Sequence, residues 1–307
     1  MTSLIGDAPV DGVDVAALLG IPISAEQERA VQAPLKPCAV IAGAGTGKTT
    51  VMAARVVWLV ASRLVSPEEI LGLTFTNKAT AELSERIESN LTRVGLLTSE
   101  QPRPTVATYD SFAGTLVNDY GAWDGINTGA HLITAARAYQ LAAEVIMGLN
   151  KAPLAATHMG PTFIAQAVVK LAGAMASHDA SPGKVRRADA RWRQMLLDAP
   201  TKRGGDRYAD IDKWLSRVDE REELLDLVAA YQNLKKERGL VEFGDRMVQA
   251  LHLVTHHPRV GEELRARYRV VLLDEYQDTS SAQADVLAAL FSGPDSAHGM
   301  GHPVMAV

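Results

Sequence analysis

The stretch of sequence that decides the fold is residues 38–50, CAVIAGAGTGKTT. Its first five residues form an apolar run typical of a β-strand, and the glycine-rich segment after them favours a tight turn. Helix-forming residues follow from Lys48. This order of strand, loop and helix is the context that a phosphate-binding loop requires.

The residue types in this loop fit phosphate chemistry. Glycines let backbone N–H groups face phosphate oxygens, and the following helix adds positive potential at its first turn. We expect Lys48 to reach the β- and γ-phosphates of a nucleotide and the Thr49 hydroxyl to bind Mg²⁺. The alternative is a glycine-rich turn that only joins a strand to a helix. The expected nucleotide contacts are Ala42, Gly43, Ala44, Gly45, Thr46, Gly47, Lys48, Thr49 and Thr50.

A second apolar run, residues 270–275, reads VVLLDE and ends in two adjacent carboxylates. A fully apolar run is typical of a central parallel strand, and we expect it to lie beside the first strand. Asp274 would then hold Mg²⁺ through its water shell while Glu275 orients and deprotonates an attacking water. The alternative is an ordinary transition from strand to loop, which the presence of the phosphate loop in the same chain disfavours.

Strand and helix signals alternate around these two motifs, which predicts an α/β fold with a parallel sheet covered on both faces. Long helical patterns dominate from about 113 to 240, so we expect a helical insertion there, with a weak strand signal near Leu132. The expected strands are residues 70–75, 105–107, 269–273 and 303–307, and the expected helices are 48–64, 77–94 and 110–120.

Composition excludes several classes of protein. The 307 residues are 47% hydrophobic with a net charge of −5 and one cysteine, Cys38, so the chain is neither disordered nor held by disulfides. The first twenty residues contain no Lys or Arg, unlike a secretory or transit peptide, and we expect a cytoplasmic protein. No uncharged apolar run approaches the ~18 residues needed to span a bilayer, so a membrane role has no support. The acidic total still allows a local positive groove for nucleic acid.

Six segments of the chain form an ordered set of motifs: ISAEQ at 23–27, AGAGTGKT at 42–49, TFTNKATAEL at 74–83, TYDSF at 108–112, GLVEFGD at 239–245 and DEYQDTS at 274–280. Together they resemble the UvrD/Rep/PcrA family of superfamily 1 DNA helicases, and the resemblance covers nearly the whole chain. The motifs occur in the family's order, and the family shares the alanine that begins the phosphate loop here.

This resemblance implies a RecA-like ATP-binding motor domain made of residues 1–112 and 241–307, interrupted by a helical insertion subdomain at 113–240. It implies that Gln27 reads the adenine edge and that Gln277 contacts the nucleotide. ATP and Mg²⁺ are the implied cofactors.

The resemblance also implies a surface for single-stranded DNA, because an aromatic ring suits a base, and hydroxyl, amide and ammonium groups suit the backbone. Phe75 is the expected stacking residue, and Asn77 is alternatively a helix N-cap. The family usually has His where this chain has Asp110, whose carboxylate would repel DNA or cap a helix. The implied DNA contacts are Thr74, Phe75, Asn77, Lys78, Thr108, Tyr109, Ser111 and Phe112.

The resemblance implies the N-terminal motor half of an ATP-dependent DNA helicase or translocase, moving 3′ to 5′ on single-stranded DNA and single/double-strand junctions in DNA repair or recombination. The family's second RecA-like domain has no counterpart in these residues, and losing its arginines costs ~10³-fold or more in hydrolysis, so we expect the 307 residues alone to be a poor ATPase. Two alternatives stay open: a motor subunit of a helicase-nuclease with a partner subunit, and a nucleotide-binding module without turnover. The TFTNKA string disfavours a P-loop ATPase of the structural DNA-repair type.

The insertion contains a basic stretch at 184–207, with eight Lys or Arg against three Asp. Such a strip would attract phosphates, although charge runs are also typical of solvated helix faces. Trp192 and Trp214 are interpreted as core residues without a DNA role.

Overall fold

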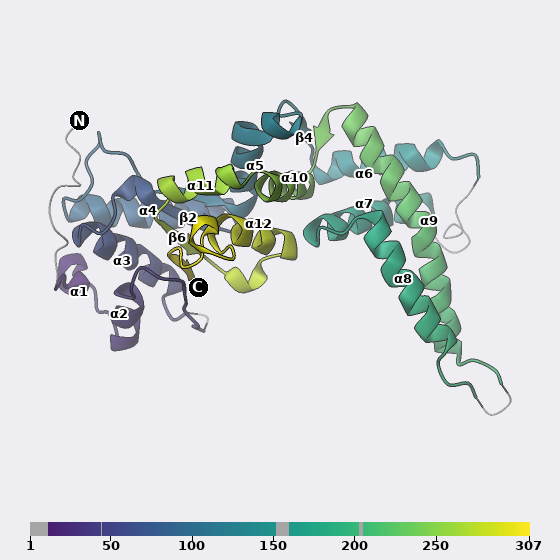
Figure 1. Cartoon of the computed structure of the whole chain (residues 1–307), viewed down its shortest axis with the longest axis horizontal. Helices are drawn as coiled ribbons and strands as arrows, with labels where there is room; N and C mark the ends of the chain where they lie inside the picture. The colour runs from purple at the N-terminus through teal and green to yellow at the C-terminus, as the bar shows by residue number, and fades with distance from the viewer. Residues whose placement is uncertain (1–11, 44, 152–159, 203–204) are drawn as a thin grey trace. The chain divides into compact units, whose positions relative to one another are not determined.

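The computed structural model describes residues 12–43, 45–151, 160–202 and 205–307 (Figure 1). The chain divides into two compact units. The first contains the described residues up to Tyr120 together with Ala250–Thr279 and Gln283–Val307, and the second contains Gly121–Gln249 and Ser280–Ala282. The boundaries predicted from the sequence were 112/113 and 240/241. None of the described helices is long and apolar enough to cross a membrane.

The first unit is built on a five-stranded sheet in which every neighbouring pair is parallel, which confirms the predicted α/β class. The strand order is β1-β7-β6-β2-β3. The acidic strand β6 was expected beside β1, and this was wrong: β7 lies between them and pairs with both. The strands are β1 Cys38–Ala39, β2 Ile70–Thr74, β3 Thr105–Thr108, β6 Val270–Leu273 and β7 Val304–Ala306.

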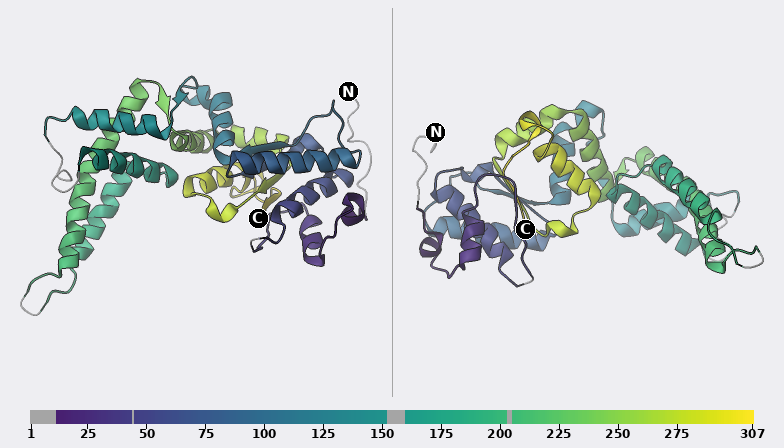
Figure 2. Two further views of the ribbon diagram at one scale, coloured as in Figure 1. Left: turned by 180° about the vertical axis from the view of Figure 1, so that it is seen from behind. Right: turned by 60° about the horizontal axis from the view of Figure 1, so that its bottom comes forward.

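The two central strands are apolar on both faces because helices cover both sides of the sheet. Every residue of β2 and of β6 is buried. Ile70, Leu272 and Met305 belong to one hydrophobic core with the first four helices. In Figure 2 the sheet lies between the purple and blue helices of the first part of the chain and the yellow-green helices of its last part. The helices of this unit are α1 Val15–Leu19, α2 Ala25–Val31, α3 Lys48–Ala61, α4 Asn77–Arg93, α5 Tyr109–Tyr120 and α11 Pro258–Arg267, while α10 Phe243–His256 and α12 Ser281–Phe291 each contribute to both units.

The second unit consists mainly of the helices predicted for the middle of the chain. Its core contains Leu141, Val168, Leu225 and Tyr231, each at most 1% exposed. The strand signal near Leu132 is confirmed as a two-stranded parallel sheet, whose second strand was not predicted. The elements are β4 His131–Leu132, α6 Ala135–Met147, α7 Pro161–Ser177, α8 Pro182–Leu197, α9 Ala209–Glu237 and β5 Leu240–Val241.

Helices α8 and α9 lie side by side (Figure 1), and two arginines of the basic stretch, Arg186 and Arg193, form ion pairs between them. Arg186 contacts Glu222 and Asp226, each at 2.6 Å. Further cations of the stretch also pair with carboxylates: Lys184 with Asp179, Arg193 with Asp219 and Arg207 with Asp212. Arg203 lies outside the described residues. The local positive excess is therefore smaller than the sequence suggested.

The two tryptophans of the helical unit are exposed, which corrects their interpretation as core residues. Trp192 is 51% exposed and Trp214 46%. Their ring centroids lie 6.1 Å apart, and the Arg217 guanidinium lies 4.9 Å from the Trp214 ring. The two rings pack on each other across the α8–α9 pair and stay at its surface.

Candidate functional site

The glycine-rich loop turns into α3 through two glycines in the left-handed region. Gly45 has a φ of +77° and Gly47, the N-cap of α3, has +82°. A Cβ on Gly47 would lie 3.2 Å from Gln27 Nε2, so a side chain there would crowd the loop. The Thr46 hydroxyl donates to the Gly43 carbonyl at 2.8 Å. Because the first N–H groups of a helix have no acceptor within it, this turn presents amides at the start of α3. Ala44 lies outside the described residues.

Gln27 supports this loop from the side. Its Nε2 donates to the Thr46 carbonyl at 3.0 Å, and its Oε1 accepts from the Ser24 N–H at 2.9 Å. The second contact belongs to a capping box that begins α2. The carboxamide thus bridges a helix N-terminus and the loop, and its expected role at adenine stays a prediction.

Arg55 on α3 holds the segment after α2 in place. Its side chain is 1% exposed, and Nη1 donates to the carbonyls of Ala30, Val31 and Ala33 at 3.2, 3.0 and 2.8 Å. This buried guanidinium supplies donors to carbonyl groups at and just after the end of α2, where helical hydrogen bonds run out. It therefore holds α2, which carries Gln27, against α3, the helix that follows the loop.

The acidic pair after β6 meets the lysine of the loop. Lys48 Nζ lies 2.8 Å from Glu275 Oε2, and Gln277 Nε2 also donates to this oxygen. These contacts, with Lys48 first, hold the pKa of Glu275 below its usual range. Asp274 is 7% exposed, and its burial and the neighbouring Glu275 raise the pKa of its carboxyl. The two adjacent carboxylates therefore have opposite electrostatic environments, as a division of roles requires.

A hollow of 920 Å³ runs along this edge of the sheet and is lined by loop residues, the start of α3 and the segment after β6. Two of its polar lining residues, Arg86 and Tyr276, were not among the site residues predicted from the sequence. Arg86 donates to the Thr50 hydroxyl at 2.9 Å, and Tyr276 is 40% exposed. Tyr276 was inside the quoted DEYQDTS string, whereas no local pattern around Arg86 points to a nucleotide.

The residues at this edge fit the way proteins hold Mg²⁺ beside a nucleotide. No group of three or more His, Cys, Asp or Glu within the described ranges forms a metal cage. Mg²⁺ ordinarily takes only one or two protein ligands and completes its shell with phosphate oxygens and water. Thr49 and Asp274 would supply the hydroxyl and the carboxylate for such a site. Their assignment to the metal stays a prediction.

The expected DNA residues divide into a buried layer and an exposed layer. Thr74 has no exposed surface, and its hydroxyl bonds Thr80 Oγ1 at 2.6 Å. Thr108, Tyr109 and Phe112 are 8%, 3% and 6% exposed. The structure brings these four residues together inside the fold, so their side chains are not exposed to single-stranded DNA at the surface.

The exposed layer consists of Phe75, which is half-buried, and of Asn77, Lys78 and Ser111, which are exposed. Thr76 is the N-cap of α4 and accepts from the Ala79 N–H at 3.1 Å, so the alternative interpretation of Asn77 as the cap was wrong. The helix begins one residue earlier than that interpretation assumed, because the Thr76 hydroxyl supplies the cap. Asn77 therefore keeps its amide at the surface.

Asp110 lies in the first turn of α5, where a negative charge is favourable to the helix dipole. It is not the cap of this helix, because the Ser111 N–H donates to the Thr108 hydroxyl at 3.0 Å. Burial raises the pKa of the Asp110 carboxyl, and a hydrogen bond with Gln283 opposes this shift.

A parallel sheet, a glycine loop that begins α3 and an acidic pair at the end of β6 define this unit as a P-loop NTPase domain. The family comparison is more specific: residues 23–303 match the model of the UvrD/REP helicase N-terminal domain. The chain belongs to this family, which confirms the resemblance found from its motifs.

Relatives of this chain are named as helicases. It is 28% identical to DNA helicase II of Rickettsia typhi over 88% of this chain and 36% of that protein. It is 28% identical to ATP-dependent DNA helicase UvrD1 of Mycobacterium tuberculosis over 96% of this chain and 33% of that protein. With DNA helicase II of Escherichia coli the identity is 26% over 88% and 32%. The chain thus spans about a third of the length of these relatives.

Proposed function

We propose that this chain is the N-terminal motor part of an ATP-dependent DNA helicase or translocase that moves 3′ to 5′ on single-stranded DNA in repair or recombination. The observation that supports it most is the meeting of Lys48 and Glu275 at 2.8 Å in the hollow beside α3. Two groups more than two hundred positions apart converge there, one suited to phosphate and one to an attacking water. The family membership supports DNA as the nucleic acid along which the protein moves.

In this proposal the loop amides and Lys48 hold the ATP phosphates, and Glu275 orients and deprotonates the attacking water. Mg²⁺ held by Thr49 and Asp274 would neutralise charge that develops on the phosphates. The low pKa of Glu275 keeps its carboxylate ionised, which is the state that accepts a proton. Phe75, Asn77, Lys78 and Ser111 form the DNA contact, with the buried residues supporting them.

The test is ATP hydrolysis by the intact gene product with and without oligo(dT), followed by strand displacement from duplexes with 3′ or 5′ tails. Glu275→Gln should lower kcat by about 10²- to 10⁴-fold and retain ATP binding, because only the base is lost. Glu68→Gln makes the same charge change at an exposed position of the same unit and should hydrolyse ATP normally.

Normal turnover by Glu275→Gln would remove its role as the base. An intact protein that binds ATP but never hydrolyses it, with or without DNA, would instead be a nucleotide-binding module. Displacement from 5′-tailed duplexes alone would overturn the polarity.

A further inference from the structure

Three residues meet at the carboxyl edge of the sheet because they follow three neighbouring strands. Tyr109 comes directly after β3, Phe75 after β2 and Asp274 after β6. The register pairs Thr74 with Thr108, and the Asp274 N–H donates to the Leu73 carbonyl at 2.9 Å. The topology thus places the expected stacking residue, a buried tyrosine and the first carboxylate of the acidic pair side by side.

Tyr109 contacts both of its neighbours. Its ring centroid lies 4.9 Å from that of Phe75, with the ring planes tilted by 53°. Its hydroxyl donates to the main-chain carbonyl of Asp274 at 3.3 Å. One side chain therefore joins the half-buried DNA residue to the backbone of the acidic pair.

The hydrogen bond acts at a strained point of the chain. The Asp274 carbonyl belongs to the peptide group that joins Asp274 to Glu275, and Glu275 has a φ of +49°. L-residues rarely adopt this left-handed conformation, so surrounding contacts have to hold it. Tyr109 fixes one side of this peptide group, and the Lys48 ion pair fixes the Glu275 carboxylate beyond it.

We propose that Tyr109 is the positioning residue through which single-stranded DNA at Phe75 sets the placement of the Asp274–Glu275 peptide and so stimulates ATP hydrolysis. This inference rests on the proposed function and adds a coupling role within it. Tyr109 was expected to touch DNA, but at 3% exposed it acts through Phe75. A base stacked on Phe75 would press on the Tyr109 ring, and the hydroxyl would transmit the shift to the backbone that carries both carboxylates.

The test uses the intact gene product and the variant Tyr109→Phe, which keeps the ring and removes the hydrogen bond. Three quantities are measured: the ATPase rate without DNA, the rate at saturating oligo(dT) and the oligo(dT) Kd. The DNA-stimulated ratio should fall about three- to tenfold, the range expected for one hydrogen bond, while the Kd stays within about twofold.

Tyr268→Phe is the matched control. Tyr268 is 4% exposed, and its hydroxyl bonds Thr105 Oγ1 at 3.4 Å at the opposite ends of β3 and β6. The Tyr268→Phe variant removes a buried hydroxyl and a comparable hydrogen bond beside the same two strands, at their ends away from the acidic pair. Its stimulated ratio should match that of the unmodified protein.

A second variant, Phe75→Leu, removes the other contact of Tyr109 and keeps the inference open to test if Tyr109→Phe unfolds. It should also lower the ratio, and the double variant should lower it no further, because residues in one link are not additive. Full stimulation in Tyr109→Phe, additive effects in the double variant, or a Kd of Tyr109→Phe that rises in step with its lost stimulation would each overturn the coupling role. If oligo(dT) does not change the ATPase rate of the unmodified protein, the proposed function itself has failed.

Discussion

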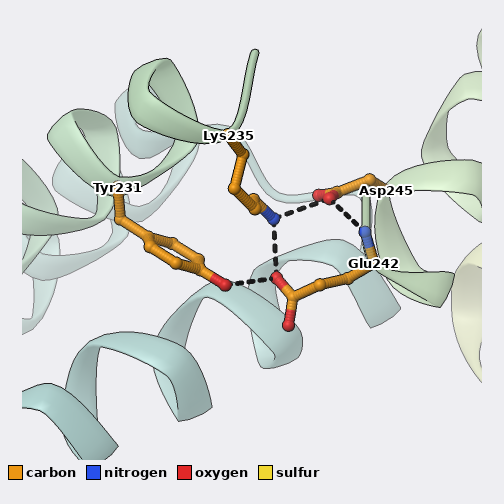
Figure 3. A network of polar contacts seen from close by, with 4 residues as sticks. All are labelled: Tyr231, Lys235, Glu242 and Asp245. Atoms are coloured by element: carbon orange, nitrogen blue, oxygen red, sulfur yellow. Dashed lines mark hydrogen bonds and ion pairs between the residues drawn. The ribbon is translucent and has the colours of Figure 1, made fainter. Parts of the chain in front are cut away.

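Two lysines, one in each unit, pair closely with carboxylates in different surroundings. Lys48 is 17% exposed and its partner Glu275 is 42% exposed, at the edge of the hollow beside α3. Lys235 is 2% exposed and contacts both Glu242 and Asp245 at 2.6 Å (Figure 3). A lysine at an open edge can exchange its carboxylate partner for a phosphate more readily than a buried lysine can. The comparison sets a cation that we propose binds a ligand against one that holds two helices together.

The network around the buried Lys235 joins the end of α9 to the start of α10. The Tyr231 hydroxyl donates to Glu242 Oε2 at 2.8 Å, and Asp245 accepts from the Glu242 N–H at 2.8 Å as well as from Lys235 (Figure 3). The Lys235 ammonium also lies 4.7 Å from the Tyr231 ring. Each member therefore has a second partner, which is what a buried charge needs to remain in a core.

The largest expected effect comes from breaking this network. Lys235→Met leaves two carboxylates without their cation, so the free energy of unfolding of the helical unit should fall by about 3–5 kcal/mol. Urea unfolding followed by helical circular dichroism measures it. Lys236→Met, next to it and exposed, should stay within about 0.5 kcal/mol of the unmodified protein. Equal stability of the two variants would place Lys235 among ordinary surface cations.

The opposite result is expected at the open edge. Lys48→Ala should weaken MgATP binding by about 1.5–3 kcal/mol, the range for hydrogen bonds to charged groups, and change the unfolding free energy by less than about 1 kcal/mol. Calorimetric titration with a non-hydrolysable ATP analogue gives the affinity, with the exposed Lys36→Ala as control. Unchanged affinity in Lys48→Ala would refute the phosphate-loop assignment and remove the contrast between the lysines.

The smallest expected effect concerns a single hydroxyl of the network. Tyr231→Phe removes the donor to Glu242 and keeps the ring under Lys235, so stability should fall by about 0.5–1.5 kcal/mol. Tyr139→Phe is the control, because its hydroxyl makes no hydrogen bond to another described residue and its ring packs against the same core. Thermal unfolding compares the two. A loss equal to that of Lys235→Met would mean that the hydroxyl, rather than the ion pair, secures the network.

Local patterns were enough to predict a strand beginning at Cys38, the turn and the helix from Lys48 that follow it, and the buried strand that ends at Leu273, although the first strand covers only Cys38–Ala39. Each of these depends on a short run of residues with one clear physical requirement, such as glycine in the left-handed region or an apolar strand between two layers of helices. The helix from Asn77 was also predicted, because its core positions Leu83, Ile87 and Leu91 repeat at helical spacing. It ends at Arg93, one residue before its predicted end.

Features that depend on distant partners could not be predicted in the same way. The position of β7 between β1 and β6 depends on backbone pairing, which leaves no mark on the side chains of Val304–Ala306. The pairing of Asp219 and Glu222 on α9 with arginines on α8 could not be predicted from the sequence, because it depends on how the two helices pack. The exposure of Trp192 was missed for a related reason, since burial depends on whether a third helix covers the pair.

The pairing of β1 with β7 also constrains how the protein is made. Cys38 pairs with Met305, so the strand before the phosphate loop gains its neighbour in the sheet only after the chain has been made as far as β7. At about 5–20 residues per second, a ribosome needs on the order of ten seconds or more to supply β7. During that interval the edge of β6 that β7 later covers is an unpaired apolar edge, the kind of surface that nascent chains offer to chaperones. The nucleotide site is thus among the last parts of this unit to form during synthesis.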